Sequence, residues 1–440
     1  AHIRFGETLM NESTSAWQSG RAIATARARG GLFRRLVLDA IRNMTAGCLR
    51  LELPDGETVM MGTPGAAASA NIRVLDDAFF QKCVLFGDVG FGESYMDGDW
   101  ETDSISRVIA WAVLNVENSP GMSGSKARAF ALNLLKSYNR LLHLVRPNSM
   151  ATSRRNIAEH YDLGNDFYRL WLDGTMTYSS AYFTEAEQSL EEAQLAKYDA
   201  LCRKLRLEPT DHLLEIGSGW GGFASHVVHS YGCRVTTVTI SEAQYTYALD
   251  RFTREGILDR VDLQLADYRT LTGQYDKIAS IEMMEAIGDR YLEGYFAKIN
   301  ELLKPCGLVG LQYITVPDAR HDELKRGVDW IQKHIFPGSL LLSVGRVNHA
   351  LNRTGDLFLH DLEDIGTSYV RTLHLWWERF NARIGGVRAL GFDERFVRKW
   401  NYYLQYCEAA FATRNISVVQ AVYTRPNNRN LHHNWQRSSR

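Results

Sequence analysis

Residues Glu215–Gly222 read EIGSGWGG and join the strand-like run HLLEIGSG to a following helical segment. Closely spaced glycines let a backbone turn tightly and approach a ligand, and the N–H groups at the start of the next helix point toward it. Downstream, the strand-like runs CRVTTVTI, VDLQLAD, YDKIASIE and GLVGLQYITV alternate with helical ones. This alternation predicts βαβ units in a mostly parallel sheet with helices on both faces. We therefore expect an α/β fold whose ligand lies at the glycine-rich turn.

The glycines of this turn match two cofactor templates. Gly217, Gly219 and Gly222 fit the G-x-G-x-x-G pattern of dinucleotide-binding folds. The same turn, read with Glu215 and Gly221, fits the E-x-G-x-G-x-G pattern of S-adenosylmethionine-dependent methyltransferases. The turn alone therefore leaves both cofactors open.

The ends of the next two strands favour S-adenosylmethionine. A dinucleotide site usually has an acidic residue at the end of the second strand, where it binds the ribose. Here that strand ends in Thr239 and Ile240, and Gln244 follows, so only neutral polar groups are available. Asp267 and Tyr268 follow the third strand, where a methyltransferase commonly binds the adenine amino group. We predict a methyl donor at this site, and not a nicotinamide dinucleotide.

Composition excludes several functional classes. The chain has 50 Lys and Arg against 51 Asp and Glu, so no overall positive field attracts nucleic acid. Its six cysteines include no C-x-x-C pair, which argues against a zinc knuckle and favours reduced thiols in the cytoplasm, and we expect no metal site. No apolar run approaches the roughly 18–20 residues needed to cross a bilayer, and the N-terminus lacks the profile of a signal peptide. We expect a cytoplasmic protein that reaches any lipid substrate from the membrane surface.

Four segments can be distinguished along the chain. Ser15–Met44 carries six arginines against one acidic residue, with apolar residues between them. Such a basic amphipathic arm can bind anionic headgroups, although many basic helices are simply solvated. Short β-rich runs from Gly47 to Trp100 predict a small α+β domain, and ENSPGMSGSK, Glu117–Lys126, is typical of a linker. The predicted boundaries are a basic arm over 1–46, an α+β domain over 47–116, a linker and helix over 117–150, and the cofactor-binding domain over 151–440.

A series of motifs runs in order from about Ala151 to Pro426: RRNIAEHYDLGNDFYRLWLDGTMTYSSAYF, LEIGSGWGG, VTISEAQ, DYRTL, MMEAIG and WIQKHIFPG. Together they closely resemble the cyclopropane-fatty-acyl-phospholipid synthase family. GFGESYMDGDW, Gly90–Trp100, is similar to the N-terminal lipid-binding domain of that family. The resemblance implies a Rossmann-like class I methyltransferase domain with a mostly parallel seven-stranded sheet, preceded by a small α+β lipid-binding domain.

The resemblance also implies a reaction and its partners. Members of the family transfer a methyl group from S-adenosylmethionine to the cis double bond of an unsaturated acyl chain in a membrane phospholipid. The resulting carbocation loses a proton from the new methyl group to a base, attributed to a bound bicarbonate ion, and closes to a cyclopropane ring. The implied partners are the phospholipid and an anionic surface on the inner face of the membrane. The resemblance does not decide whether the protein forms a homodimer.

The donor-binding residues can be carried over one by one. Tyr178 and Ser179 match the family's donor-contacting pair, and Asp267 matches the adenine contact. The methionine and ribose contacts fall on the glycine turn and on the end of the second strand. The predicted donor-binding residues are Tyr178, Ser179, Glu215, Gly217, Ser218, Gly219, Gly221, Thr239, Ile240, Gln244, Asp267, Tyr268 and Glu282.

The base site departs from the family pattern. The family holds bicarbonate with a Cys, a Glu, a His, a backbone group and a Tyr. The corresponding positions here are Ser180, Glu285, Gln312, the backbone of Ile314, and Trp377, so three of the four side chains differ. Aromatic faces suit a carbocation, and Tyr313 is a further candidate for that role. The predicted catalytic residues are therefore Glu285, Ser180, Gln312, Ile314, Trp377 and Tyr313.

This divergence leaves the product open. If Glu285 still anchors bicarbonate beside Ser180 and Gln312, the product is a cyclopropane acyl chain. If the base is weakened or displaced, a hydride shift moves the cation, a different proton is lost, and a methyl-branched or methylene-bearing unsaturated chain results. A catalytically inactive lipid-binding protein is the alternative from another functional class.

Overall fold

The computed structural model describes residues 31–115, 163–326 and 329–431. The chain forms two compact units. The first comprises residues 1–143, 327–333 and 387–414, and the second comprises residues 144–326, 334–386 and 415–440. Most of the predicted basic arm and the helix predicted within 117–150 lie outside the described residues. The predicted domain over 151–440 differs from this division, because segment 387–414 belongs to the first unit.

The first unit contains a four-stranded sheet in the order β2-β1-β3-β4. Its strands are β1 (Cys48–Glu52), β2 (Thr58–Gly62), β3 (Ser69–Val74) and β4 (Trp100–Glu101). Its helices include α2 (Leu32–Ile41), α3 (Ala78–Asp97), α4 (Ile105–Asn115) and α17 (Glu394–Ala412). Strands β1, β2 and β3 follow one another without an intervening helix, and the short β4 lies between α3 and α4, so this unit combines one small sheet with helices.

Helix α17 belongs to this unit because its contacts are with residues near the N-terminus. The guanidinium of Arg398 lies over the ring of Tyr95 and donates to the carbonyl oxygen of Trp100 at 2.8 Å. Tyr402 packs against Tyr95, with the ring centroids 5.9 Å apart, and against Trp330, with the centroids 4.6 Å apart. A segment distant in sequence therefore supplies part of the core of the first unit.

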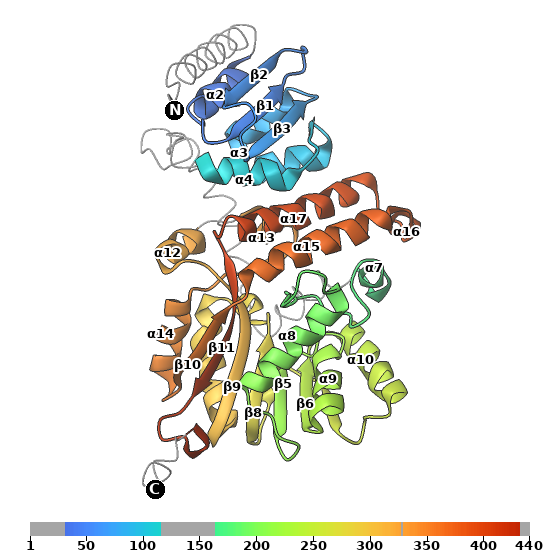
Figure 1. The fold of residues 1–440 in the computed structure, drawn as a ribbon, viewed down its shortest axis with the longest axis vertical. Helices are drawn as coiled ribbons and strands as arrows, with labels where there is room; N and C mark the ends of the chain where they lie inside the picture. The colour runs from blue at the N-terminus through green and yellow to red at the C-terminus, as the bar shows by residue number, and fades with distance from the viewer. Residues whose placement is uncertain (1–30, 116–162, 327–328, 432–440) are drawn as a thin grey trace, which may run out of the picture. The chain divides into compact units, whose positions relative to one another are not determined.

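The second unit is built on a seven-stranded sheet in the order β10-β11-β9-β8-β5-β6-β7. The strands are β5 (His212–Ile216), β6 (Arg234–Thr239), β7 (Val261–Leu265), β8 (Tyr275–Ile281), β9 (Leu303–Thr315), β10 (Phe358–Asp364) and β11 (Ser417–Thr424). Strands β5 to β9 pair in parallel, whereas β10 and β11 pair antiparallel. Figure 1 shows helices flanking this sheet. The predicted class I methyltransferase fold is confirmed.

The helices of the second unit are α7 (Asn165–Arg169), α8 (Leu190–Lys204), α9 (Gly222–Tyr231), α10 (Glu242–Glu255), α11 (Leu292–Leu302), α12 (Asp318–Arg326), α14 (Val344–Thr354) and α15 (Gly366–Ala382). Two short helices, α13 (Trp330–His334) and α16 (Ile384–Ala389), lie where the chain passes from one unit to the other. Among the described helices, none combines the length and the hydropathy that a bilayer-spanning segment needs.

The strand order determines where a ligand can bind. From β5 the chain moves outward through β6 and β7, and then returns to the other side of β5 with β8 and β9. Open α/β sheets bind ligands at the carboxyl ends of the strands, at this point of reversal. The loops after β5 and β8 carry the glycine turn and residues Glu282–Glu285, so both predicted parts of the site meet there.

Candidate active site

The glycine turn after β5 has the conformation that its sequence predicts. Gly217, Gly219 and Gly221 have φ of +97°, +49° and +83°, in the left-handed region that favours glycine. A Cβ added at Gly221 would lie 2.7 Å from the ring of Phe252, whereas one added at Gly219 would meet no described atom within 4 Å. The turn is therefore packed on one side and open above Gly219, as a cofactor-binding turn requires.

Glu215 and Ser218 stabilise this turn from within. The buried carboxylate of Glu215 accepts a hydrogen bond from the Thr237 hydroxyl at 2.5 Å, and burial raises the pKa of Glu215 to about 8. The backbone N–H groups of Gly217 and Ser218 both donate to the carbonyl oxygen of Val238, at 3.0 and 2.9 Å. These contacts fasten the turn to strand β6.

The end of β6 supplies the neutral polar groups predicted for the ribose. The Thr239 hydroxyl donates to Oε1 of Gln244 at 2.9 Å, and Ile240 lies next to it in the chain. Ser241 caps helix α10 by accepting a hydrogen bond from the Gln244 N–H. This arrangement fixes the amide of Gln244 at the strand end without any acidic side chain.

The predicted adenine acceptor is already engaged by a neighbouring cation. Asp267 is buried, and its two carboxylate oxygens accept hydrogen bonds from Nε and Nη2 of Arg269 at 2.8 and 2.6 Å. Tyr268 packs edge-on against Tyr295, and burial raises its pKa to about 12. Binding of an adenine amino group at Asp267 therefore requires competition with Arg269, a residue that the sequence did not single out.

Tyr178 and Ser179 lie among aromatic residues and beside a buried lysine. The Tyr178 ring lies 5.4 Å from the ring centroids of both Trp171 and Trp376. The Ser179 hydroxyl accepts a hydrogen bond at 2.7 Å from Nζ of Lys197, and burial lowers the pKa of that lysine to about 7. Lys197 was missed in the sequence, although it lies on the same face of α8 as the buried residues Ala193, Gln194 and Leu201.

Glu282, which was predicted to bind the donor, is hydrogen-bonded to two residues of the predicted base site. It follows β8 with an unusual φ of +48°. Its Oε1 accepts hydrogen bonds from the Ser180 N–H at 2.9 Å and from the Gln312 amide at 2.8 Å, and its Oε2 accepts one from the Tyr369 hydroxyl at 2.9 Å. Burial raises the pKa of Glu282, against the opposing effect of these hydrogen bonds and of Lys197. A side-chain carboxylate thus joins Ser180, Gln312 and Tyr369.

Glu285 and Ile314 come together as expected. The Ile314 N–H donates to Oε1 of Glu285 at 2.6 Å. Oε2 of Glu285 is buried and makes no hydrogen bond within the described part of the chain. Burial, and to a lesser extent the negative charge of Glu282, raises the pKa of Glu285 to about 8. A buried carboxylate oxygen without a partner is costly, so this atom marks a place where a reacting group can be accommodated.

Two residues of the predicted catalytic set lie elsewhere. Tyr313 follows Gln312 on β9 and therefore points to the opposite face of the sheet, where it is buried with its hydroxyl 3.3 Å from that of Tyr423. Trp377 is only partly buried and pairs with His374. From α15 it is Tyr369 that donates to the carboxylate of Glu282, and its position relative to the sheet could not be read from the sequence.

The residues present do not fit a bicarbonate ion as the resemblance implies. The N–H of Ser180 and the amide of Gln312 already donate to Glu282, and the Ile314 N–H already donates to Glu285. The carbonyl oxygen of that Gln312 amide in turn accepts from Gln420 at 3.1 Å. Protein carboxylates therefore occupy the hydrogen-bonding positions that the anion would need.

Fatty-acyl methyltransferases and cyclopropane synthases are similar to this chain in sequence. The family model described as Mycolic acid cyclopropane synthetase matches residues 148–421. Tuberculostearic acid methyltransferase UfaA1 of Mycobacterium tuberculosis is 37% identical, over 84% of this chain and 86% of its own length. Cyclopropane-fatty-acyl-phospholipid synthase of Escherichia coli K12 is 38% identical, over 82% of this chain and 89% of its own length.

Solved structures give the same result. The cyclopropane synthase MmaA2 from Mycobacterium tuberculosis superposes with a TM-score of 0.57 at 29% identity, over 61% of this chain and 97% of that one. The mycolic acid cyclopropane synthase CmaA1, complexed with SAH and CTAB, has the same TM-score at 30% identity, over 61% of this chain and 97% of that one. The chain therefore belongs to the mycolic acid cyclopropane synthetase family, a family of S-adenosylmethionine-dependent methyltransferases that act on fatty acyl chains.

Proposed function

We propose that this protein transfers a methyl group from S-adenosylmethionine to the cis double bond of an unsaturated acyl chain carried by a membrane phospholipid, through a carbocation. The name of the Escherichia coli relative specifies a fatty-acyl phospholipid, and the CmaA1 structure contains both SAH and a long-chain amphiphile, CTAB. The observation that carries the proposal is the pair Glu282 and Glu285 beside the open glycine turn, at the carboxyl ends of adjacent strands.

Different residues of the site would stabilise the cation and remove the proton. When bound, S-adenosylmethionine supplies a methyl group that the alkene accepts with its π electrons, which leaves a positive charge on the acyl chain. The faces of Tyr178 and Trp376 can stabilise that charge. A base must then remove a proton. An alkene offers no strong hydrogen-bonding group, so positioning and electrostatic stabilisation must provide most of the rate enhancement.

We assign the base to Glu285. Its Oε2 makes no hydrogen bond to any described residue. The pKa of Glu285 is raised to about 8, close to neutral pH, and a general base is most effective when its pKa lies near the working pH. Glu282 takes a different role, because its carboxylate oxygens accept hydrogen bonds from Ser180, Gln312 and Tyr369. It fixes the polar cluster and adds negative charge near the cation.

A cyclopropane acyl chain is the first candidate product, and a methyl-branched or methylene-bearing unsaturated chain without a ring is the second. A carboxylate attached to the backbone has a fixed reach, whereas a bound anion can move with the proton that it removes. The relative UfaA1 is named a tuberculostearic acid methyltransferase. Glu282 at the anion position therefore favours a hydride shift along the acyl chain before the proton is lost, which leaves a double bond and no ring.

Product analysis distinguishes these outcomes. Purified protein is incubated with vesicles of monounsaturated phospholipid and with S-adenosylmethionine that carries a trideuterated methyl group. Mass spectrometry of the acyl chains then counts the retained deuterium. Ring closure or an exocyclic methylene removes one deuterium, and a methyl branch beside a double bond keeps all three; catalytic hydrogenation separates the ring from the methylene. Donor binding without any methyl transfer would instead indicate a lipid-binding protein without activity.

A further inference from the structure

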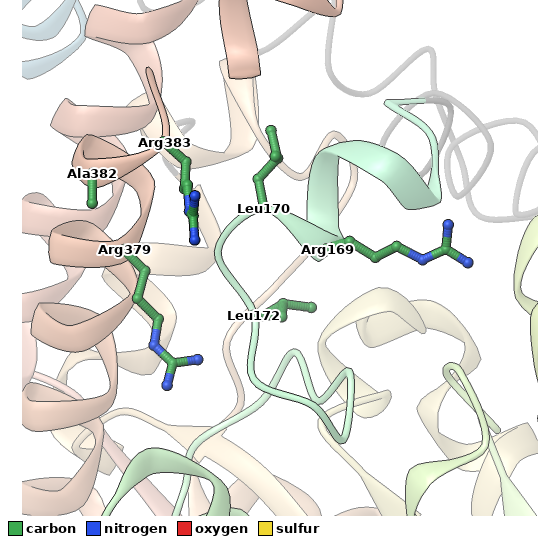
Figure 2. Close-up of a pocket in the computed structure, with 6 residues that line it drawn as sticks. All are labelled: Arg169, Leu170, Leu172, Arg379, Ala382 and Arg383. Carbon is green, nitrogen blue, oxygen red and sulfur yellow. The ribbon is translucent and has the colours of Figure 1, made fainter. Parts of the chain in front are cut away.

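A surface pocket of about 470 Å³ lies in the second unit, outside the carboxylate cluster. It is lined by Arg169, Leu170, Leu172, Arg379, Ala382 and Arg383. Figure 2 shows Arg379 and Arg383 extending from the end of α15 toward the loop that carries Leu170 and Leu172, whereas Arg169 extends the other way. The pocket thus combines two cationic side chains with an apolar wall.

The charges of Arg379 and Arg383 have no opposite charge paired with them in the described ranges 31–115, 163–326 and 329–431. The two residues are four positions apart, so their side chains lie on the same side of the chain, and like charges at this spacing repel. Neither guanidinium has a hydrogen bond or ion pair with any residue that the structure describes. Arg169, by contrast, pairs with Asp166 at 2.8 Å and lies over the ring of Tyr247. The negative end of the helix dipole favours a cation in the last turn of a helix. This interaction alone does not explain why two arginines face one pocket.

Two adjacent guanidinium groups are suited to a phosphate group. The planar forks of arginine bind phosphate oxygens through paired charge-assisted hydrogen bonds. The leucines on the opposite wall suit the apolar part of a molecule that carries the phosphate. A phospholipid has both parts, whereas a free phosphate ion has only one.

The distance along α15 fits this assignment. Tyr369, which bonds Glu282, lies ten residues before Arg379, which corresponds to about 15 Å at about 1.5 Å per residue. A hydrocarbon core of about 30 Å inside a bilayer of about 40–45 Å places a mid-chain carbon roughly 13–15 Å from the headgroup layer. A lipid with its headgroup at the arginines could therefore place a mid-chain double bond near the carboxylates.

We propose that Arg379 and Arg383 bind the phosphate of the phospholipid whose acyl chain is methylated. This assignment rests on the proposed function for the identity of the lipid, and the pocket itself can be tested without turnover.

The first experiment measures selectivity for a phosphate-bearing substrate. Full-length protein and the Arg379→Gln/Arg383→Gln variant are assayed on dioleoylphosphatidylcholine vesicles and on detergent-dispersed dioleoylglycerol, which has the same acyl chains without phosphate. Each lost charge-assisted hydrogen bond is expected to lower kcat/KM on the phospholipid at least about tenfold, with little change on dioleoylglycerol. The control, Arg254→Gln/Arg260→Gln, removes two exposed arginines elsewhere in the unit. Equal losses on both lipids would overturn the proposal.

The second experiment measures binding alone. Titration calorimetry with dihexanoylphosphatidylcholine, a saturated lipid that cannot react, is expected to show binding to the wild type and the control and at least about tenfold weaker binding to the double variant. Equal binding to all three proteins, or equally tight binding of inorganic phosphate to the wild type, would overturn the assignment. If no unsaturated lipid is turned over but binding still depends on the arginines, the proposed function fails and the lipid site stands. If the double variant unfolds, the single exposed change Arg383→Gln replaces it in both experiments.

Discussion

At the scale of single residues, the site depends on how two glutamates share the available donors. Glu282 accepts three hydrogen bonds, whereas Glu285 accepts one from Ile314 and keeps one buried oxygen without a partner. The three hydrogen bonds hold the Glu282 carboxylate in position, whereas the free oxygen of Glu285 can accept a proton. Their different surroundings separate a positioning role from a catalytic role.

Replacing the base should affect turnover and spare donor binding. In Glu285→Gln the amide oxygen can still accept from the Ile314 N–H, but it cannot take up a proton. We expect turnover to fall about 10²–10⁴-fold, with affinity for S-adenosylmethionine within about twofold of the wild type. Activity on phospholipid vesicles and titration with the donor measure the two quantities. Glu301→Gln, an exposed change on α11, is the control; parallel loss of turnover and donor binding would make Glu285 structural.

The raised pKa of Glu285 predicts a pH dependence. The base must be ionised, so kcat/KM should rise with pH and level off above about 8. The effect on stability has the opposite sign, because the native state holds this proton more tightly than the unfolded state does. The Glu285 contribution should therefore weaken the fold as pH rises from about 4.5 to about 8. Rates on zwitterionic vesicles between pH 6 and 9 test the first point, and a flat profile would exclude Glu285 as the base.

At the scale of elements, the rotation of helix α15 determines which side chains reach the site. Tyr369, Leu373, Trp376 and Phe380 are buried at helical spacing, and Trp377 lies about 100° further round the helix. If the family motif is aligned with this helix a few residues out of register, the matched residue therefore lies on the wrong face. Tyr369 donates to Glu282, whereas Trp377 pairs with His374.

Matched substitutions on α15 can distinguish these faces. Tyr369→Phe removes one hydrogen bond to a carboxylate, worth about 1.5–3 kcal/mol, so we expect turnover to fall at least about tenfold. Trp377→Phe should change turnover less than about threefold. Steady-state rates of both variants on the same vesicles provide the measurement. A larger effect at Trp377 would restore the assignment made from sequence.

The glycine turn offers a stability prediction with an internal control. Gly221→Ala would place a methyl group 2.7 Å from Phe252 at a φ of +83°, so we expect a loss of about 1–3 kcal/mol in the free energy of unfolding. Gly294→Ala, in helix α11, meets no atom within 4 Å and should stabilise the protein by up to about 1 kcal/mol. Thermal unfolding of both variants measures the difference, and equal melting temperatures would contradict it.

The sequence predicted what depends on local pattern. Alternating strands and helices gave the sheet, and the glycine spacing gave the turn. The family motifs placed Glu285 and the backbone of Ile314 in one site, and the structure joins them by a hydrogen bond. The role of Glu282 could not be predicted, because it depends on one left-handed backbone angle after β8. Tyr369, Lys197 and Arg269 were missed because their partners lie on other elements or require side-chain geometry.

At the scale of the whole molecule, the first unit is discontinuous in sequence. Its four-stranded sheet and helices α2, α3 and α4 come from the first quarter of the chain, and α17 comes from residues 394–412. A fragment of residues 1–143 should therefore fail to fold fully, because the surfaces that α17 covers would be exposed. We expect this fragment to bind a hydrophobic dye strongly and to unfold without a cooperative transition, unlike the full chain. A sharp transition in the isolated fragment would contradict this prediction.

The same discontinuity has a consequence for synthesis on the ribosome. About 280 residues separate the end of α4 from the start of α17. At about 5–20 residues per second, the first unit remains incomplete for roughly 15–60 s after its sheet has left the exit tunnel. During that interval the second unit is translated almost entirely, although it begins later in the gene. The first unit is thus expected to finish folding only after residue 412 has left the exit tunnel, and until then chaperones would find a binding surface on the segment that carries α3 and α4.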